Sequence, residues 1–192
     1  KLNIAEFEKL SIKLLADTDL AAVQHGLGEL YLKQSRLDSA PEDMLDKARE
    51  QFAAAMGGTF GGWAQAGLAW TFWNEQRHGV CRTNFLQAAT KLSHPEERSL
   101  FNFKAIEATF RSGDMPEVLS LGRVFLANAA PANLRNNTLI LMARAAINEA
   151  SDRPGGFGEA RRMVSNLDSS LMPLRKAQAT LLLARAESRK GN

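Results

Sequence analysis

The sequence of 192 residues has a single cysteine, no long apolar run and few β-branched residues. Because Cys81 is alone, the chain cannot form an internal disulfide, and its fold must be stabilised by side-chain packing. A membrane-spanning helix needs about 20 apolar residues, whereas the longest apolar stretch, near residues 139–142, is interrupted by Arg144. The scarcity of valine, isoleucine and threonine disfavours strands, and the abundance of alanine, leucine, glutamate and arginine favours helices.

Charge of one sign is not concentrated in any part of the chain. The 24 lysines and arginines only slightly outnumber the 21 acids, and the two signs are interspersed, which gives a net charge of +3. A protein that binds nucleic acid normally gathers its basic residues on one face. The composition therefore predicts no nucleic-acid partner and is that of an ordinary soluble folded protein.

Residue groups typical of catalysis or metal binding are also missing. The three histidines lie in separate segments, and no two of them are one helical turn apart, as ligands on one helix would be. A catalytic thiol needs an activating base and partial exposure, and we interpret Cys81 as a buried packing residue. The glycine-rich residues 57–62 lack the Gly-Lys-Ser/Thr ending of a phosphate loop and are interpreted as a turn. We expect no catalytic residue, no cofactor and no metal ion.

What the sequence does contain is a motif that returns at nearly even intervals. The first three copies are Gln24-x2-Leu27-Gly28-x2-Tyr31, Trp63-x2-Ala66-Gly67-x2-Trp70 and Asn102-x2-Ala105-Ile106-x2-Thr109. Fainter copies end at Ala146 and Glu187, and the corresponding positions of the five copies are 28, 67, 106, 143 and 184. The period is about 39 residues, a length typical of a solenoid, in which each unit buries its apolar face against its neighbours.

Proline placement indicates where the helices begin. Five of the six prolines fit a first helical turn, where the missing N–H would have no partner: Pro41, Pro95, Pro116, Pro131 and Pro173. We predict ten helices, over residues 3–16, 19–35, 41–56, 60–76, 79–92, 95–112, 115–129, 131–151, 156–168 and 171–190. Because the connections are short, successive helices should pack as antiparallel hairpins.

The motif W-x2-L-G-x2-Y followed by A-x3-F resembles the tetratricopeptide repeat. The residues that carry the resemblance most closely are Trp63, Ala66, Gly67, Trp70, Phe85 and Ala88, with Cys81 in the alanine position. A second set is Leu27, Gly28, Tyr31, Ala48, Phe52 and Ala55. The period exceeds the family's usual length of about 34 residues, chiefly through extra residues at 35–44 and 153–158. The resemblance implies an all-α, right-handed superhelix of four to five units in one domain over residues 1–192, with Gly28 and Gly67 at close helix contacts.

In the tetratricopeptide family, the first helix of each unit lines a concave groove beside the motif residues. Carried onto this sequence, the resemblance implies a groove that is apolar in the middle and cationic toward the C-terminus. Its partner-binding residues would be Phe72, Phe103, Glu107, Phe110, Arg111, Arg144, Asn148, Arg185 and Arg189. In an alternative interpretation, Arg144 and Arg185 only bridge neighbouring helices.

The resemblance implies a non-enzymatic scaffold that binds a peptide or helix of another protein, within a bacterial pilus, secretion or exopolysaccharide assembly machine. Such a scaffold would be soluble in the cytoplasm or periplasm. Two alternatives remain open: a sensor arm of a transcription or signalling protein, and an accessory superhelical domain of an enzyme. We also expect the chain to be an interior piece of a longer array, whose last helix exposes Leu181, Leu182 and Leu183 and can self-associate through them.

Overall fold

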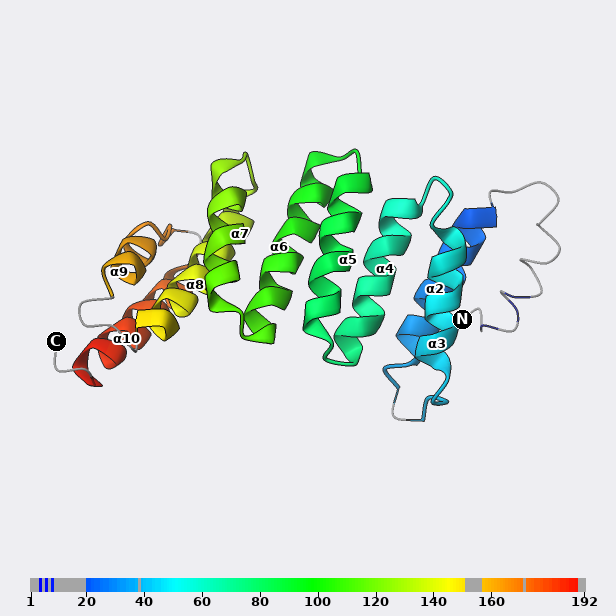
Figure 1. Cartoon of the computed structure of the whole chain (residues 1–192), viewed down its shortest axis with the longest axis horizontal. Coiled ribbons are helices and arrows are strands. Elements are labelled where there is room, and N and C mark those ends of the chain that lie inside the picture. The colour runs from blue at the N-terminus through cyan, green and yellow to red at the C-terminus, as the bar shows by residue number, and fades with distance from the viewer. Residues whose placement is uncertain are drawn as a thin grey trace. The chain divides into compact units, whose positions relative to one another are not determined.

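The computed structural model describes residues 4, 6, 8, 20–37, 39–150, 157–170 and 172–189 (Figure 1). Every regular element in these ranges is an α-helix, which confirms the all-α class. The helices are α2 (Leu20–Gln34), α3 (Met44–Ala55), α4 (Gly61–Asn74), α5 (His78–Lys91), α6 (Pro95–Ser112), α7 (Met115–Ala127), α8 (Ala132–Ala150), α9 (Gly158–Ser165) and α10 (Pro173–Arg189). The nine corresponding predictions are confirmed to within three residues at each end, and the expected helix 3–16 falls mostly outside the described residues. None of the described helices is long and apolar enough to span a bilayer.

The first residues of three helices show how local chemistry sets where a helix begins. Pro95 and Pro173 are the first residues of α6 and α10, as their missing N–H favours. Between α6 and α7 the backbone turns at Gly113, whose φ of 85° is accessible to glycine at no steric cost. Asp114 then caps α7 by accepting a hydrogen bond of 3.2 Å from the Glu117 backbone N–H.

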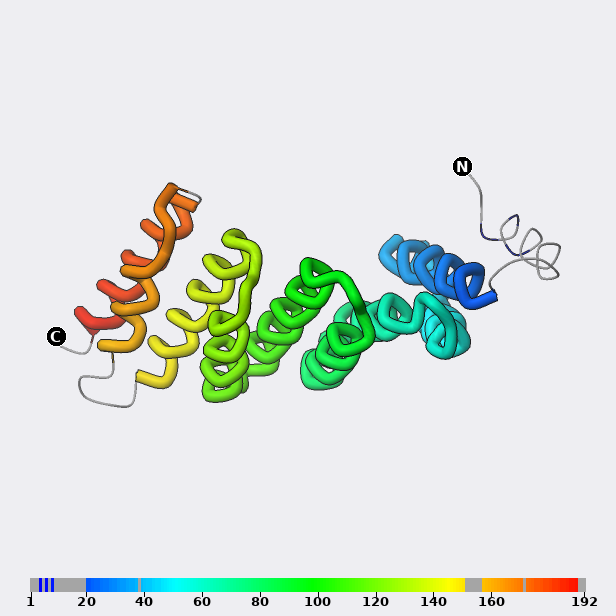
Figure 2. The backbone as a smooth tube through the Cα atoms, turned by 90° about the horizontal axis from the view of Figure 1, so that it is seen from above, coloured from blue at the N-terminus to red at the C-terminus, as the bar shows by residue number. Residues whose placement is uncertain are grey.

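The helices form two units, Lys1–Phe101 and Asn102–Asn192, which divide within α6. In the first unit α2 packs on α3, α3 on α4 and α4 on α5, and successive helices alternate in direction (Figures 1 and 2). The predicted antiparallel hairpins are therefore present here. Residues 57–62 form the turn between α3 and α4 and the first residues of α4, as expected for this glycine-rich segment.

The core of the first unit is centred on Phe52 of α3, which is fully buried. A Cβ atom added to Gly28 of α2 would lie 2.7 Å from Cδ1 and Cε1 of this ring, and one added to Gly67 of α4 would lie 2.3 Å from Cε1. No real Cβ atom approaches another side chain so closely. The two glycines therefore let α2 and α4 close over the same edge of Phe52, and the expectation of close helix contact at both positions is confirmed.

Aromatic rings extend this core toward α5 and α6. Phe85, also fully buried, has its ring centroid 5.1 Å from that of Trp70 in an edge-to-face arrangement. Its centroid lies 5.9 Å from that of Phe101, against which it is stacked, and Trp63 meets Phe101 edge to face at 5.4 Å. Such ring pairs contribute about 0.5–1.5 kcal/mol each beyond the area they bury.

In the second unit α7 packs on α8, α8 on α9, and α10 on both α8 and α9. Its core includes Ile106, Val118 and Met142, each at most 2% exposed. Two core threonines satisfy their hydroxyls within their own helices, since Thr109 donates to the Ala105 carbonyl and Thr138 to the Leu134 carbonyl, both at 2.8 Å. These two hydroxyls are thus paired locally and need no partner across a helix interface.

Polar contacts fix α10 in place. The Asn136 side chain of α8 accepts a hydrogen bond of 3.2 Å from the Asp168 backbone N–H, just before α10. Lys176 Nζ reaches back 2.7 Å to the Leu167 carbonyl. On the α9 side, Arg161 Nε donates to Glu187 Oε1 at 2.6 Å. Another stretch of α10 faces α8, and the candidate site lies between these two helices.

Candidate functional site

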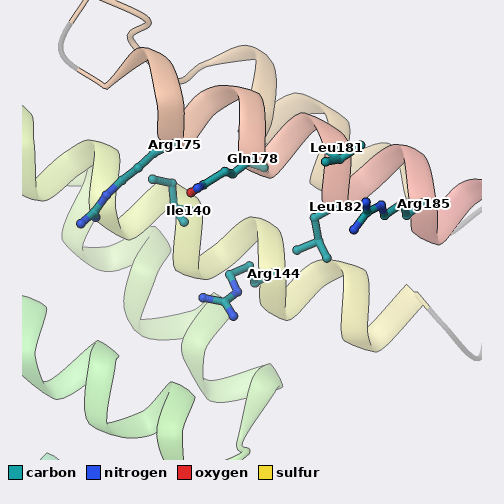
Figure 3. Close-up of a pocket in the computed structure, with 8 residues that line it drawn as sticks. Ile140, Arg144, Arg175, Gln178, Leu181, Leu182 and Arg185 are labelled. Atoms are coloured by element: carbon teal, nitrogen blue, oxygen red, sulfur yellow. The ribbon is translucent and has the colours of Figure 1, made fainter.

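A hollow of about 600 Å³ lies between α8 and α10 in the second unit (Figure 3). Its lining combines apolar and cationic side chains: Ile140, Arg144, Arg175, Gln178, Ala179, Leu181, Leu182 and Arg185. A second hollow of about 340 Å³ shares Leu182 and Arg185 with the first, and its other lining residues are Ile147, Asn148, Phe157, Ala186 and Arg189. We call the two together the α8–α10 groove.

Helical spacing explains why these residues share the groove. On α10 the polar and apolar lining residues Arg175, Gln178, Leu182, Arg185 and Arg189 are separated by 3, 4, 3 and 4 positions. Side chains at this spacing lie on one face of a helix. On α8 the residues Ile140, Arg144, Ile147 and Asn148 follow the same rule. Each helix therefore turns one stripe toward the space between them.

The groove is cationic because none of the lining residues that the structure describes is an acid. Arg175 donates to Asn137 Oδ1 at 2.6 Å, and the Arg144 guanidinium lies 5.1 Å from the centroid of the Phe110 ring. Arg185 and Arg189 are exposed and make no hydrogen bond or ion pair through their side chains within the described part of the chain. Two guanidinium groups are therefore free to bind an anionic group from outside.

The neighbouring carboxylate on α10 does not neutralise these arginines. Glu187 is engaged by Arg161 of α9, and its side chain is only 20% exposed. The acid is thus held on the side of α10 away from the α8–α10 groove. Its pairing within the second unit keeps the positive charge of Arg185 and Arg189 uncompensated.

The apolar part of the groove is open as well. Leu181 and Leu182 are 51% and 40% exposed, which confirms the expected apolar surface on the last helix. The expectation is wrong for Leu183, which is 7% exposed because it packs into the core of the second unit. In Figure 3, Leu182 points from α10 toward α8, above Arg144.

The structure brings together four of the predicted groove residues, Arg144, Asn148, Arg185 and Arg189. Phe110 is added to them through its contact with Arg144, so this arginine also links α6 and α8, in keeping with the bridging interpretation. Arg185 makes no such bridge among the described residues. Sequence reasoning missed Ile140 and Arg175, although each lies at helical spacing from a predicted residue, four before Arg144 and ten before Arg185.

The other predicted groove residues are engaged elsewhere. Phe103 is wrong as a groove residue, because it is 8% exposed and packs in the core of the second unit. Glu107 is paired with Lys104 at 2.9 Å and with Arg111 at 3.6 Å.

Phe72 belongs to the first unit, where its half-buried ring is covered by guanidinium groups. Arg49 lies 5.2 Å and Arg77 4.8 Å from the ring centroid. This cation–π arrangement takes up the face that a partner would contact.

Cys81 is fully buried, and its Sγ lies 3.2 Å from the Arg77 carbonyl. Burial raises the pKa of this thiol to about 11, so it is protonated and unreactive near neutral pH. Among the described residues, no group of three or more histidine, cysteine, aspartate or glutamate side chains could hold a metal ion.

The α8–α10 groove can therefore bind carboxylate or phosphate through its guanidinium groups and apolar side chains through its leucines. Comparison of the chain with protein-family models, curated proteins and solved structures finds no match. The function has to be inferred from the groove itself.

Proposed function

We propose that this chain is a non-enzymatic scaffold of tetratricopeptide-like helical hairpins that binds a segment of another protein in the α8–α10 groove. The observation that carries the proposal is the pairing of free guanidinium groups, Arg185 and Arg189, with exposed leucines in one open groove. The repeat motif and the antiparallel hairpins of the first unit support the superhelical arrangement. The setting in a bacterial assembly machine follows from the resemblance alone.

The energetics of the groove favour a protein segment as its ligand. Full burial of an exposed leucine side chain stabilises a complex by about 1.5–3 kcal/mol, and because Leu181 and Leu182 are 51% and 40% exposed, burying the rest of each contributes about half of that. A hydrogen bond between charged groups adds about 1.5–3 kcal/mol. Because the helix that presents the arginines is held to α9 through Arg161 and Glu187, the ordering on binding is confined to side chains and leaves the helix backbone in place.

The proposal is tested by using the immobilised chain to capture proteins from an extract of its source organism. The variant Arg185→Glu/Arg189→Glu reverses the two free charges of the groove. Its matched control is Arg36→Glu/Arg162→Glu, which makes the same charge change at two exposed arginines outside the groove.

We expect the parent chain and the control to retain the same proteins and the groove variant to lose them. Circular dichroism should show equal helicity for all three chains, because the substituted side chains are exposed. Equal retention by the groove variant would refute the proposed binding site.

A further inference from the structure

Five of the eight lining residues of α10 follow the spacing of a helix–helix seam. Arg175, Gln178, Leu182, Arg185 and Arg189 are separated by 3, 4, 3 and 4 positions, the alternation that recurs where two helices pack along each other. Steps of this kind average about 5 Å along the helix axis. Side chains on one face of an extended chain recur only at about 6.7 Å, which is twice the rise of a strand residue. A partner helix that lies along α10 would present its side chains at the same intervals, whereas an extended segment would not.

The charges of the groove determine what such a helix must carry. Arg144, Arg175, Arg185 and Arg189 supply four positive charges, and no acid is among the described residues of the lining. Ile140 and Leu182 provide apolar contacts from opposite sides of the groove. Complementarity requires a partner with acids flanking an apolar stripe.

We infer that the segment held in the α8–α10 groove is an acidic amphipathic helix. This inference rests on the proposed function and adds the chemistry and conformation of the partner. Arg175 and Arg189 are 14 positions apart, which corresponds to about 21 Å along α10. The partner helix consequently needs about 14 residues to span the groove, with apolar side chains every three or four positions and carboxylates on both borders.

Other occupants fit the groove less well. A second copy of the chain bound through the same groove would bring its own arginines against these, which costs several kcal/mol for like charges. A flat anionic membrane would contact the exposed arginines but would leave Ile140, which is only partly exposed between the two helices, without an apolar contact. A nucleic acid would leave the leucines unburied. Its bases would also find no ring to stack on, because Phe157, the aromatic residue among the described lining residues, is only 2% exposed.

The test is a selection from a display library of random peptides of about 16 residues, long enough to span the groove as a helix. The full chain serves as bait, and an excess of the Arg185→Glu/Arg189→Glu variant in solution removes binders of other surfaces. We expect enriched peptides to be net acidic, with apolar residues at three- and four-residue spacing. Enrichment of neutral or basic peptides, or of acidic peptides without that spacing, would overturn the inference.

Affinity measurements on the enriched peptide separate its two contributions. Leu182→Ser, in the groove, should weaken binding about tenfold or more, equivalent to about 1.4 kcal/mol. Leu174→Ser is the matched control, because Leu174 is 70% exposed on the same helix but does not line the groove, and it should leave the affinity unchanged. Replacing the peptide's glutamates by glutamine should also weaken binding about tenfold. An unchanged affinity in either the Leu182→Ser or the glutamine measurement would contradict the inference.

The competing occupants are tested with the same chains. Vesicles containing phosphatidylserine, a single-stranded oligonucleotide and concentrated chain alone should each fail to compete with the peptide. Competition by any of them, abolished by Arg185→Glu/Arg189→Glu, would assign the groove to that ligand instead. If groove-dependent capture of a protein persists while no acidic helical peptide competes with it, the inference fails and the proposed function stands. If groove-dependent capture is absent, the proposed function itself fails.

Discussion

Replacement of Gly67 by alanine should destabilise the first unit, although alanine is the better helix former. In an exposed helix this substitution gains about 1 kcal/mol. Here the new Cβ would lie 2.3 Å from Phe52 Cε1. The ring is fully buried, and the same Cδ1–Cε1 edge lies so close to Gly28 that an added Cβ there would be only 2.7 Å away, so α2 leaves the ring little room to turn away.

The magnitude follows from these opposing effects. Overpacking of a well-packed core costs about 1–3 kcal/mol, and the overlap at Phe52 places Gly67→Ala toward the upper end of that range. Subtracting the gain of about 1 kcal/mol in helix propensity leaves a net destabilisation of about 1–2 kcal/mol. The larger side chain of Gly67→Leu should cost more.

Urea unfolding followed by tryptophan fluorescence measures this loss where it occurs. All three tryptophans, Trp63, Trp70 and Trp73, lie in α4, so their emission reports on the first unit. Gly79→Ala is the matched control, because Gly79 is also helical but has nothing within 4 Å of its Cβ position. The control should unfold at the same urea concentration as the parent or at a higher one.

A double variant identifies the ring as the cause. In a Phe52→Leu background the overlap is reduced, so the cost of Gly67→Ala should fall by about 0.5 kcal/mol or more relative to the parent, a coupling typical of residues in contact. If Gly67→Ala is as stable as Gly79→Ala, or costs the same in both backgrounds, the close contact between α4 and Phe52 does not limit packing and the reasoning is refuted.

Three further predictions concern other buried groups. Gly122→Ala should cost less than Gly67→Ala in urea unfolding, because its Cβ would meet the flexible Met142 side chain, 2.4 Å away at Sδ, rather than a ring; an equal or larger cost would contradict this. Cys81 should react with iodoacetamide at pH 8 only as fast as the first unit opens, because burial raises its pKa to about 11, and labelling at the rate of a free thiol would show that it is accessible. Burial also lowers the pKa of His25 in the folded chain below its usual 6.5. The unfolded chain therefore takes up this proton at a higher pH than the folded chain does, and stability should fall as the pH drops below about 6.5. His25→Gln should reduce that pH dependence, and an unchanged slope would remove His25 as its source.

The sequence by itself determined the helical class and the positions of the helices, because both depend on local spacing. Pro95 and Pro173 begin helices because their own missing N–H groups suit a first helical turn. Apolar positions three and four apart identify one face of a helix, whatever that face packs against. The close contacts at Gly28 and Gly67 were also predictable, since a repeated small residue in a repeated motif occupies the same place in each unit. The distribution of apolar and small residues alone carried this information.

Only the tertiary structure decided which helix faces stay open. Leu182 and Leu183 are adjacent and chemically identical, yet one is 40% and the other 7% exposed. On the same helix, Glu187 is paired with Arg161, while Arg185, two positions before it, has no side-chain partner among the residues that the structure describes. Exposure and pairing depend on the neighbours that α8 and α9 bring to each side of α10, and those contacts lie between segments far apart in the chain. Local spacing cannot specify them, so the sequence indicated cationic groove residues on α8 and α10, but only the packed helices show which of their side chains stay open and unpaired among the described residues.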